Sequence, residues 1–254
     1  MRIWLALAVI FAAVQAQANC RLALALALDV SGSVDEKEYV LQMNGVATAL
    51  ADPDVQNALF AMPDVPVALA IYEWSSSAYQ RMILEWTMLN GPADLEAIRT
   101  TLLEWRRNPA PEATGLGASM LYGRDLLARS PECWQNTLDI SADGKNNDWP
   151  VPERLRREGR LGTMTVNALV IGEDFLSTLD QTPDGIAELS AYFTARIIYG
   201  PNAFVEIATG YEDYATAMTR KLLRELATLP LGSLDEPASE SRNVRLARQS
   251  RASD

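Results

Sequence analysis

Residues 21–33 read R-L-A-L-A-L-A-L-D-V-S-G-S, and this stretch decides the fold. Leucine occupies every second position from Leu22 to Leu28, and alanine fills the positions between. Because side chains alternate between the two faces of a strand, both faces of this strand are apolar. Such a strand is typical of the centre of a parallel sheet that helices cover on both sides. Asp29, Ser31 and Ser33 follow at once, so oxygen-bearing side chains stand at its carboxyl end.

The rest of the chain alternates strand-like and helix-like segments. We expect five more strands, at residues 65–72, 81–86, 134–141, 164–171 and 203–208. The spacing of apolar residues predicts helices that begin near Asp35, at Pro92 and at Gly115, with Thr114 as the N-cap of the third, and a last helix over about 211–226. The short link between the second and third strands suits a hairpin. This pattern predicts an α/β fold, a doubly wound, mostly parallel six-stranded sheet with helices on both faces.

Composition excludes several classes of function. The chain has 254 residues and a formal net charge of −11, which makes it a poor candidate for binding nucleic acid through phosphates. It contains no histidine. That excludes a Ser-His-Asp triad, a Cys-His pair, a histidine general base and any histidine-ligated metal. A metal would have to bind mainly to oxygen, or to the two cysteines.

The two ends of the chain differ from its body. Arg2 precedes an apolar run over residues 3–14, which is shorter than the ~20 residues of a membrane span. Ala16-Gln17-Ala18 then provides a small-x-small cleavage pattern. We interpret residues 1–18 as a signal peptide, in preference to a buried helix, and expect a periplasmic or secreted protein with no transmembrane segment. Residues 19–230 would form one domain, and the polar residues 231–254 a disordered tail.

The predicted sheet brings oxygen ligands together at one edge. In the common strand order 3-2-1-4-5-6, ligands bind where the order reverses, between strands one and four. The first strand ends at Asp29, Ser31 and Ser33, the fourth leads into Asp143, and Thr114 stands at the head of a helix. Two carboxylates and three hydroxyls suit a hard cation such as Mg²⁺. The alternative is that the Asp and Ser side chains only form a turn and a helix cap.

The motif Asp29-Val30-Ser31-Gly32-Ser33 resembles the D-x-S-x-S motif of von Willebrand factor type A (VWA) domains, where it forms the metal-ion-dependent adhesion site (MIDAS). Ala113-Thr114-Gly115 resembles the segment that supplies the threonine of that site, and Asp143-Gly144 resembles its Asp-Gly pair. Motif order and strand order both match over about residues 20–228. Length, leader and Asn146-Asn147 are also similar to an uncharacterised group of exported bacterial proteins with this Rossmann-like VWA fold.

The resemblance implies a role for each matching residue. Ser31 and Ser33 would bind the metal through their hydroxyls, and Asp29 and Thr114 directly or through water. Asp143 would bind the metal through water, or would form hydrogen bonds to the residues that bind it. The residue before Asp143 is Ala142, where many relatives have Thr or Ser, so Ser141 is a second candidate from the fourth strand. The metal would be Mg²⁺, Mn²⁺ or Ca²⁺, and its open position would take a carboxylate from a partner protein.

The two cysteines and one buried acid are given structural roles. In an exported protein a single pair of cysteines is more often bridged than free. The fold of the resembling family would place Cys20 and Cys133 at the same end of adjacent strands, opposite the metal site, which implies a disulfide. Asp139 lies inside the fourth strand, and we expect it to be a paired structural acid because an unpaired buried carboxylate is costly.

Three functions follow from these observations. The first is an exported, non-enzymatic module that binds a protein through a divalent cation. The second is a metal-assisted hydrolase, although the D-x-D pattern of aspartyl-phosphate chemistry is absent, since Ser31 takes its second place. The third is a structural envelope protein that the metal only stabilises.

Overall fold

The computed structural model describes residues 19–172 and 184–227. The expected signal peptide and polar tail lie outside these residues. The described strands form one sheet in the order β3-β2-β1-β4-β5-β6. Their bounds are β1 (Cys20–Asp29), β2 (Val67–Trp74), β3 (Gln80–Leu89), β4 (Cys133–Ala142), β5 (Thr165–Ile171) and β6 (Val205–Ala208). This is the predicted strand order, and it reverses between β1 and β4.

The sheet is parallel except at one edge. β1 pairs in parallel with both β2 and β4, β4 with β5, and β5 with β6. β3 pairs antiparallel to β2, as the short connection between them predicted. The α/β, mostly parallel, six-stranded architecture is therefore confirmed.

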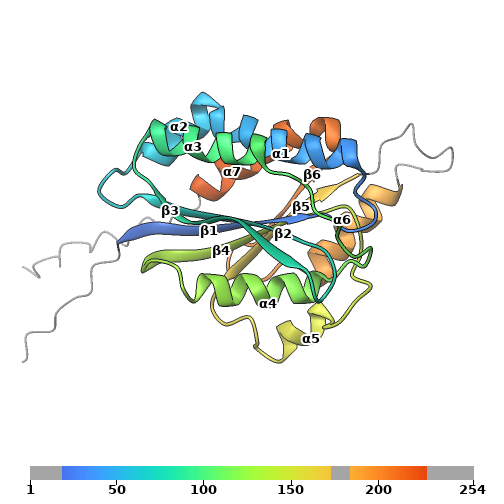
Figure 1. Cartoon of the computed structure of the whole chain (residues 1–254). Coiled ribbons are helices and arrows are strands. Elements are labelled where there is room, and N and C mark those ends of the chain that lie inside the picture. The colour runs from blue at the N-terminus through green and yellow to red at the C-terminus, as the bar shows by residue number, and fades with distance from the viewer. Residues whose placement is uncertain (1–18, 173–183, 228–254) are drawn as a thin grey trace, which may run out of the picture.

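Helices cover both faces of the sheet (Figure 1). One layer contains α1 (Glu36–Ala51), α2 (Pro53–Phe60), α3 (Pro92–Glu104) and α7 (Tyr214–Ala227), which a short 3₁₀ turn over Tyr211–Asp213 precedes. The other layer contains α4 (Leu116–Leu127), α5 (Pro152–Arg157) and α6 (Asp184–Arg196). The helices α2, α5 and α6 were not predicted from the sequence. The start of α2 has a recognisable helix N-terminal signal, because Asp52 is its N-cap and Pro53 is its first residue.

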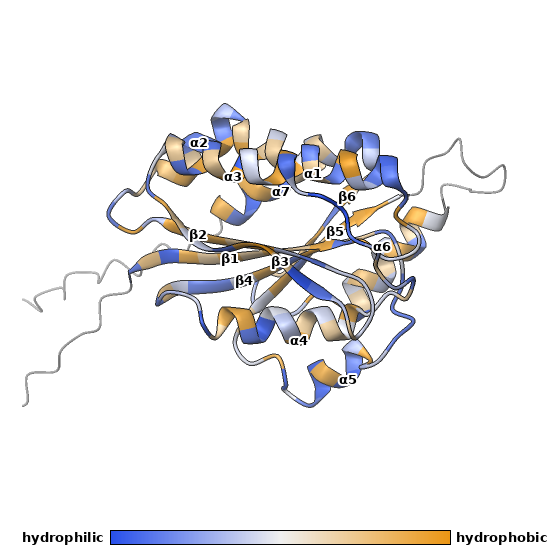
Figure 2. Cartoon of the chain, viewed as in Figure 1, coloured by the Kyte–Doolittle hydropathy of each residue, from blue (hydrophilic) through white to orange (hydrophobic). Residues whose placement is uncertain are grey.

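The alternation in β1 builds two separate cores. Its leucines pack with apolar side chains of α1, α3 and α7, whereas its alanines lie in a second cluster with residues of α4, β4 and α6. β1 is largely apolar between helices that are mixed in polarity, whereas β3 and β4 also contain hydrophilic stretches (Figure 2). Each buried leucine contributes roughly 1.5–3 kcal/mol relative to an exposed one. The same pattern that fixes β1 at the centre therefore fixes which helices lie on each side.

Local capping explains where α1 begins. The Asp35 carboxylate accepts a hydrogen bond from the Glu38 amide at 2.8 Å, and the Glu38 carboxylate accepts one from the Asp35 amide at 2.7 Å. This reciprocal arrangement satisfies donors that would otherwise lack partners at the helix start. It also ends the loop that carries Ser31 and Ser33, so the helix fixes the far end of that loop.

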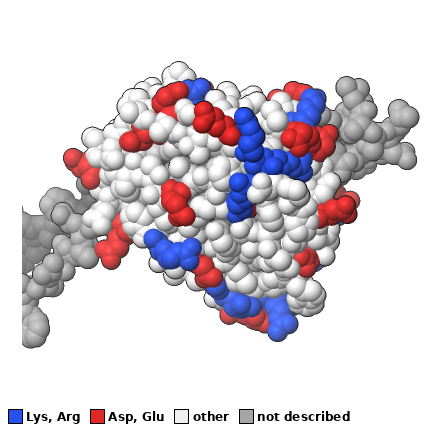
Figure 3. Space-filling model, in the orientation of Figure 1, with Lys and Arg blue, Asp and Glu red and all other residues white. Residues whose placement is uncertain are grey.

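Charged side chains of both signs are interspersed on the face shown in Figure 3. Many of them form exposed pairs, such as Lys37 with Glu212 and Arg154 with Glu158. Exposed pairs of this kind contribute only about 0–1 kcal/mol. None of the helices within the described residues is long and apolar enough to cross a membrane.

Candidate metal centre

The loop after β1 is shaped by its own aspartate. Oδ1 of Asp29 accepts a hydrogen bond from the Ser31 amide at 2.8 Å, which turns the chain immediately beyond the strand. The Gln42 side chain of α1 donates to the Asp29 carbonyl at 2.9 Å and ties the strand end to the helix. Asp29 and Ser31 are both buried, whereas Ser33 is exposed. The motif therefore leads from the core to the surface.

The structure brings the five predicted site residues together. The Thr114 hydroxyl donates to the Ser31 hydroxyl at 3.3 Å, and the Ser31 and Ser33 hydroxyls lie 3.4 Å apart. The Ser33 hydroxyl donates to Oδ1 of Asp143 at 2.6 Å. Three loops that are distant in sequence thus meet at the carboxyl edge of the sheet, where the strand order reverses between β1 and β4.

Two residues at this edge have other roles than the sequence suggested. The Ser141 hydroxyl pairs with the buried Tyr214 hydroxyl of α7 at 2.9 Å, whereas Asp143, which follows β4, accepts a hydrogen bond from Ser33 of the motif. Thr114 is not the N-cap of α4, because Gly115 occupies that position and no side chain caps the helix. The Thr114 hydroxyl is directed to Ser31 instead.

The two carboxylates lie in an unfavourable environment. Burial, followed by repulsion from Asp143, raises the pKa of Asp29 well above its ordinary value. Burial also raises the pKa of Asp143, although hydrogen bonds from Ser33 and Tyr211 act in the opposite direction. Neither carboxylate forms a salt bridge within the described residues. A cation between them would remove the repulsion and favour both charged forms.

The donor set fits a hard divalent cation. Oδ2 of Asp29 is buried and has no hydrogen-bond partner among the described residues. The side chains of the cluster that Ser31 joins, those of Ser33, Thr114 and Asp143, contact one another through carboxylate or hydroxyl oxygens. No group of three or more His, Cys, Asp or Glu residues that could hold a metal ion occurs in the described part of the chain, and the candidate site combines two carboxylates with hydroxyls. Two carboxylates and a divalent ion would sum to zero charge, which leaves the ion able to accept one more anionic ligand.

Two asparagines hold the threonine loop against the loop after β4. The Asn147 side chain accepts from the Thr114 amide at 2.7 Å, and the Asn147 amide donates to the Thr114 carbonyl at 3.0 Å. The Asn146 side chain accepts from the Gly117 amide at 3.2 Å. Sequence analysis noted Asn146-Asn147 only as part of the resemblance, because nothing in their spacing reveals which backbone they bind.

Close packing at the start of α4 requires a glycine. A Cβ atom on Gly117 would lie 1.9 Å from the Pro150 carbonyl oxygen, which is a backbone atom that cannot move away cheaply. Any other residue would push the loop after β4 away from the helix. Gly117 therefore maintains the distance between the loops that carry Thr114 and Asp143.

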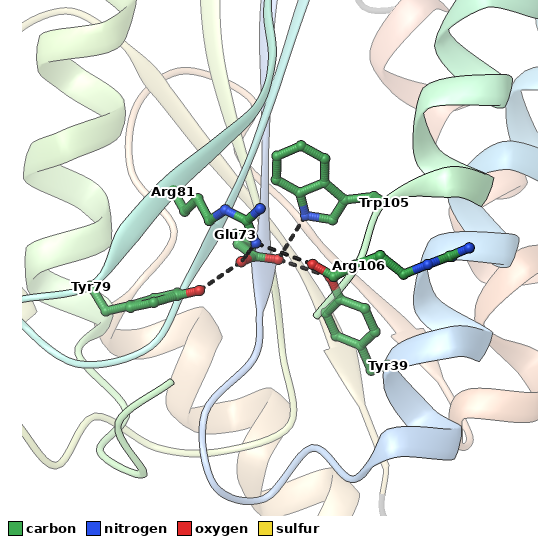
Figure 4. A network of polar contacts seen from close by, with 6 residues as sticks. All are labelled: Tyr39, Glu73, Tyr79, Arg81, Trp105 and Arg106. Atoms are coloured by element: carbon green, nitrogen blue, oxygen red, sulfur yellow. Dashed lines mark hydrogen bonds and ion pairs between the residues drawn. The ribbon is translucent and has the colours of Figure 1, made fainter. Parts of the chain in front are cut away.

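A buried carboxylate organises the neighbouring edge of the sheet (Figure 4). Glu73 in β2 accepts hydrogen bonds from the Tyr79 hydroxyl at 2.7 Å, the Tyr39 hydroxyl at 3.0 Å and the Trp105 indole at 3.1 Å. Arg81 lies 3.4 Å from the same carboxylate and stacks over the Trp105 ring. These donors come from α1, from β3 with the turn that precedes it, and from the segment after α3, so one side chain joins three parts of the chain.

The segment after α3 leads from this network to the candidate site. Arg81 donates to the Arg106 carbonyl at 3.1 Å, and Arg107 donates to the Val34 carbonyl at 2.6 Å. The first bond attaches the segment to β3, and the second attaches it to the loop after β1. The segment then continues to Thr114. The Glu73 network thereby sets the course of the chain that delivers the threonine hydroxyl.

The chain matches one family model. The model described as "Protein of unknown function (DUF1194)" covers residues 19–230. No protein with a curated description matches this sequence.

Solved structures share the fold at low sequence identity. Proximal thread matrix protein 1 from the mussel byssus, in crystal form 2, is 17% identical with a TM-score of 0.55, covering 83% of this chain and 49% of that one. The same mussel protein with a zinc-occupied MIDAS motif is 15% identical with a TM-score of 0.54, covering 83% and 49%. The pilus adhesin SpaC from Lactobacillus rhamnosus GG, in an open conformation, is 12% identical with a TM-score of 0.56, covering 84% and 31%.

These likenesses concern the fold alone. The chain spans about half the length of the mussel protein and about a third of the adhesin. They support the assignment of a VWA-like, Rossmann-type fold, which the sheet order and the two helix layers already indicate.

Proposed function

We propose that this chain, which belongs to the family described as "Protein of unknown function (DUF1194)", is an exported module. In this proposal it binds a protein partner through a divalent cation. The observation that carries the proposal is the oxygen cluster at the carboxyl edge of β1 and β4, in which a buried oxygen of Asp29 has no partner. Ser31, Ser33 and Thr114 supply hydroxyls around it.

In this proposal the chain holds the cation and the partner completes its ligand shell. Asp29, Ser31, Ser33, Thr114 and Asp143 would hold Mg²⁺, Mn²⁺ or Ca²⁺, directly or through water. A hard cation held by few protein ligands keeps open positions, and a carboxylate is the strongest oxygen ligand a protein partner can offer. The zinc-occupied MIDAS motif of the mussel protein supports a divalent cation at this edge of the fold.

We propose a binding role rather than an enzymatic one. The chain has no histidine for general acid-base work. Within the described residues, neither lysine nor arginine forms a salt bridge with Asp29 or Asp143. Metal-dependent turnover of phosphatase or esterase substrates, lost with Asp29→Asn, would contradict this assignment and favour the hydrolase alternative.

The proposal is tested by capture of partners from envelope extracts on the immobilised protein. Retention of a protein in Mg²⁺, its release by EDTA and its absence with Asp29→Asn are the expected results. The matched control is Asp125→Ala, because Asp125 is an exposed acid of α4 that pairs only with neighbouring Arg124. A partner retained equally in EDTA, or by the Asp29→Asn variant, would show that the metal edge is not the binding surface.

A further inference from the structure

A cavity lies at the opposite end of the sheet from the candidate metal site. Its volume is about 290 Å³, at the lower end of the ~300–1,000 Å³ typical of ligand sites. It is lined by the first residues of β4 and β5, by Pro201 and Asn202 before β6, and by Glu225 near the end of α7. In Figure 1 this is the end at which β1 and β4 begin.

The cavity exists because β4 begins earlier than β5. β4 pairs with β1 from the Cys20–Cys133 pair onward, but β5 joins only at the Thr137–Thr165 pair. Residues 133–136 of β4 therefore have β1 on one side and no described strand on the other. The segment before β6 contains Asn202 in the left-handed region, with φ 57°, a conformation that Asn tolerates better than most residues.

The lining is polar but almost uncharged. Three threonine hydroxyls and four amide side chains line the cavity, and no lysine or arginine does. The single carboxylate, Glu225, is 2% exposed and accepts hydrogen bonds from Lys221 at 2.7 Å and Asn167 at 2.9 Å. Lys221 pairs with this carboxylate but does not line the cavity, so the lining offers no cation to an anionic ligand. The cavity therefore suits a neutral ligand that has several hydrogen-bonding groups.

One lining group requires a donor. Oδ1 of Asn136 is buried and has no hydrogen-bond partner among the described residues. Leaving such an acceptor unsatisfied costs free energy, and a ligand hydroxyl at this position would recover it. Asn167, by contrast, is already engaged, because its side chain donates to Glu225 and accepts from the Phe204 amide at 3.1 Å.

An aromatic ring completes the cavity. Trp134 lines it and is 47% exposed, which is unusual for the largest amphipathic side chain. A pyranose ring presents an apolar C–H face that stacks on an indole and an edge of hydroxyls that pair with amides and threonines. We infer that this cavity binds a neutral saccharide unit, with Trp134 against the ring face and Asn136 and Thr165 at its hydroxyls.

The test is isothermal titration calorimetry of the full chain with neutral trisaccharides. These are α-linked and β-linked trisaccharides of glucose and a trisaccharide of N-acetylglucosamine. Trigalacturonate serves as an anionic comparison. A neutral trisaccharide should bind, and Trp134→Ala and Asn136→Ala should each weaken it about tenfold. Trp149→Ala is the matched control, because Trp149 is also exposed, at 64%, but follows Asn147 at the metal edge. Binding should be the same in Mg²⁺ and in EDTA, which separates this inference from the proposed function.

Several results would overturn the inference. They are the absence of binding by every neutral trisaccharide at millimolar concentration, equal binding of trigalacturonate, and an affinity that Trp134→Ala leaves unchanged. Thr165→Ala replaces Asn136→Ala if that variant does not fold, as judged by circular dichroism. A short extended peptide that competes at the open edge of β4, in place of any saccharide, would also contradict it.

Discussion

The Ser33 hydroxyl donates a hydrogen bond of 2.6 Å to the carboxylate of Asp143, a residue 110 positions later in the chain. The bond joins the loop after β1 to the loop after β4, on either side of the point where strand order reverses. The far oxygen of Asp143 accepts from the Tyr211 hydroxyl at 3.1 Å. Both oxygens of the Asp143 carboxylate therefore accept hydrogen bonds from hydroxyls of the protein, which fix its orientation.

Asn147→Ala is expected to weaken metal binding without removing any proposed ligand. The change leaves the Thr114 amide without its acceptor and loosens the loop that presents the Thr114 hydroxyl. Residues that orient metal ligands in this way typically contribute about 10–100-fold in affinity. Titration of Mn²⁺ or Mg²⁺ into the variant measures the loss, and Asn57→Ala on the exposed face of α2 is the control. Equal affinity in both variants would mean that metal binding does not depend on the hydrogen bond between Asn147 and Thr114.

Glu73→Gln is expected to destabilise the fold by about 1–3 kcal/mol. The carboxylate accepts hydrogen bonds from Tyr39, Tyr79 and Trp105. The amide of glutamine would replace one accepting oxygen with an NH₂ group, which cannot accept a hydrogen bond. Urea denaturation should show a lower midpoint than for wild type. Glu85→Gln, at an exposed position of β3, should leave the midpoint unchanged. A midpoint for Glu73→Gln equal to that of wild type would show that the network does not depend on the charge.

Much of this fold could be predicted from sequence because its central strands are apolar on both faces. The strand order followed from the common order of doubly wound sheets, and the antiparallel hairpin from the short connection between the second and third strands. The short helices α2 and α5 were missed because they offer too few turns for apolar spacing to stand out. α6 was missed although it is longer, in a stretch for which we predicted no element.

The sequence predicted which residues form the candidate site, but not the residues that hold them in position. Asp29, Ser31 and Ser33 are contiguous, and Thr114 and Asp143 follow recognisable segments. The choice between Asp143 and Ser141 needed coordinates, because only the packing of α7 shows that Ser141 pairs with Tyr214. The Glu73 network was equally hidden, since its donors come from three separate elements.

The buried acid Asp139 should make stability depend on pH. Lys221 lies 2.8 Å from its carboxylate, which confirms the expected pairing, but burial dominates and raises the pKa of Asp139 to about 7. The unfolded value is about 3.9, so between these values the folded state binds a proton that the unfolded state does not. The contribution of Asp139 to stability is therefore full below about pH 4 and falls as pH rises through about 7.

Thermal melts from about pH 5 to about pH 8 measure this effect. The melting temperature of wild type should fall more steeply with rising pH than that of Asp139→Asn, which cannot take up the proton. The comparison cancels the titration of groups that do not interact with Asp139. Parallel pH profiles for the two proteins would contradict the assignment to Asp139.

The disulfide should stabilise the domain by constraining the unfolded chain. Cys20 and Cys133 are paired across β1 and β4, with Cα atoms 4.5 Å apart, and are bridged as expected. They close a loop with a sequence separation of 113, for which the chain-entropy model gives about 4–5 kcal/mol. Reductant should lower the urea midpoint of wild type and leave that of a Cys20→Ser, Cys133→Ser double variant unchanged. A wild-type midpoint that reductant does not alter would contradict this role.

The most direct test of the central claim is the thermal stability of the folded protein in Mg²⁺, Mn²⁺, Ca²⁺ or EDTA, measured beside Asp29→Asn and Asp125→Ala. A cation that binds only the folded state should add about 2.7 kcal/mol at a hundredfold excess over its dissociation constant. We predict this stabilisation in wild type and Asp125→Ala and its loss in Asp29→Asn. An increase that persists in Asp29→Asn, or no increase with any of the three ions, would contradict a metal site at this edge of the sheet.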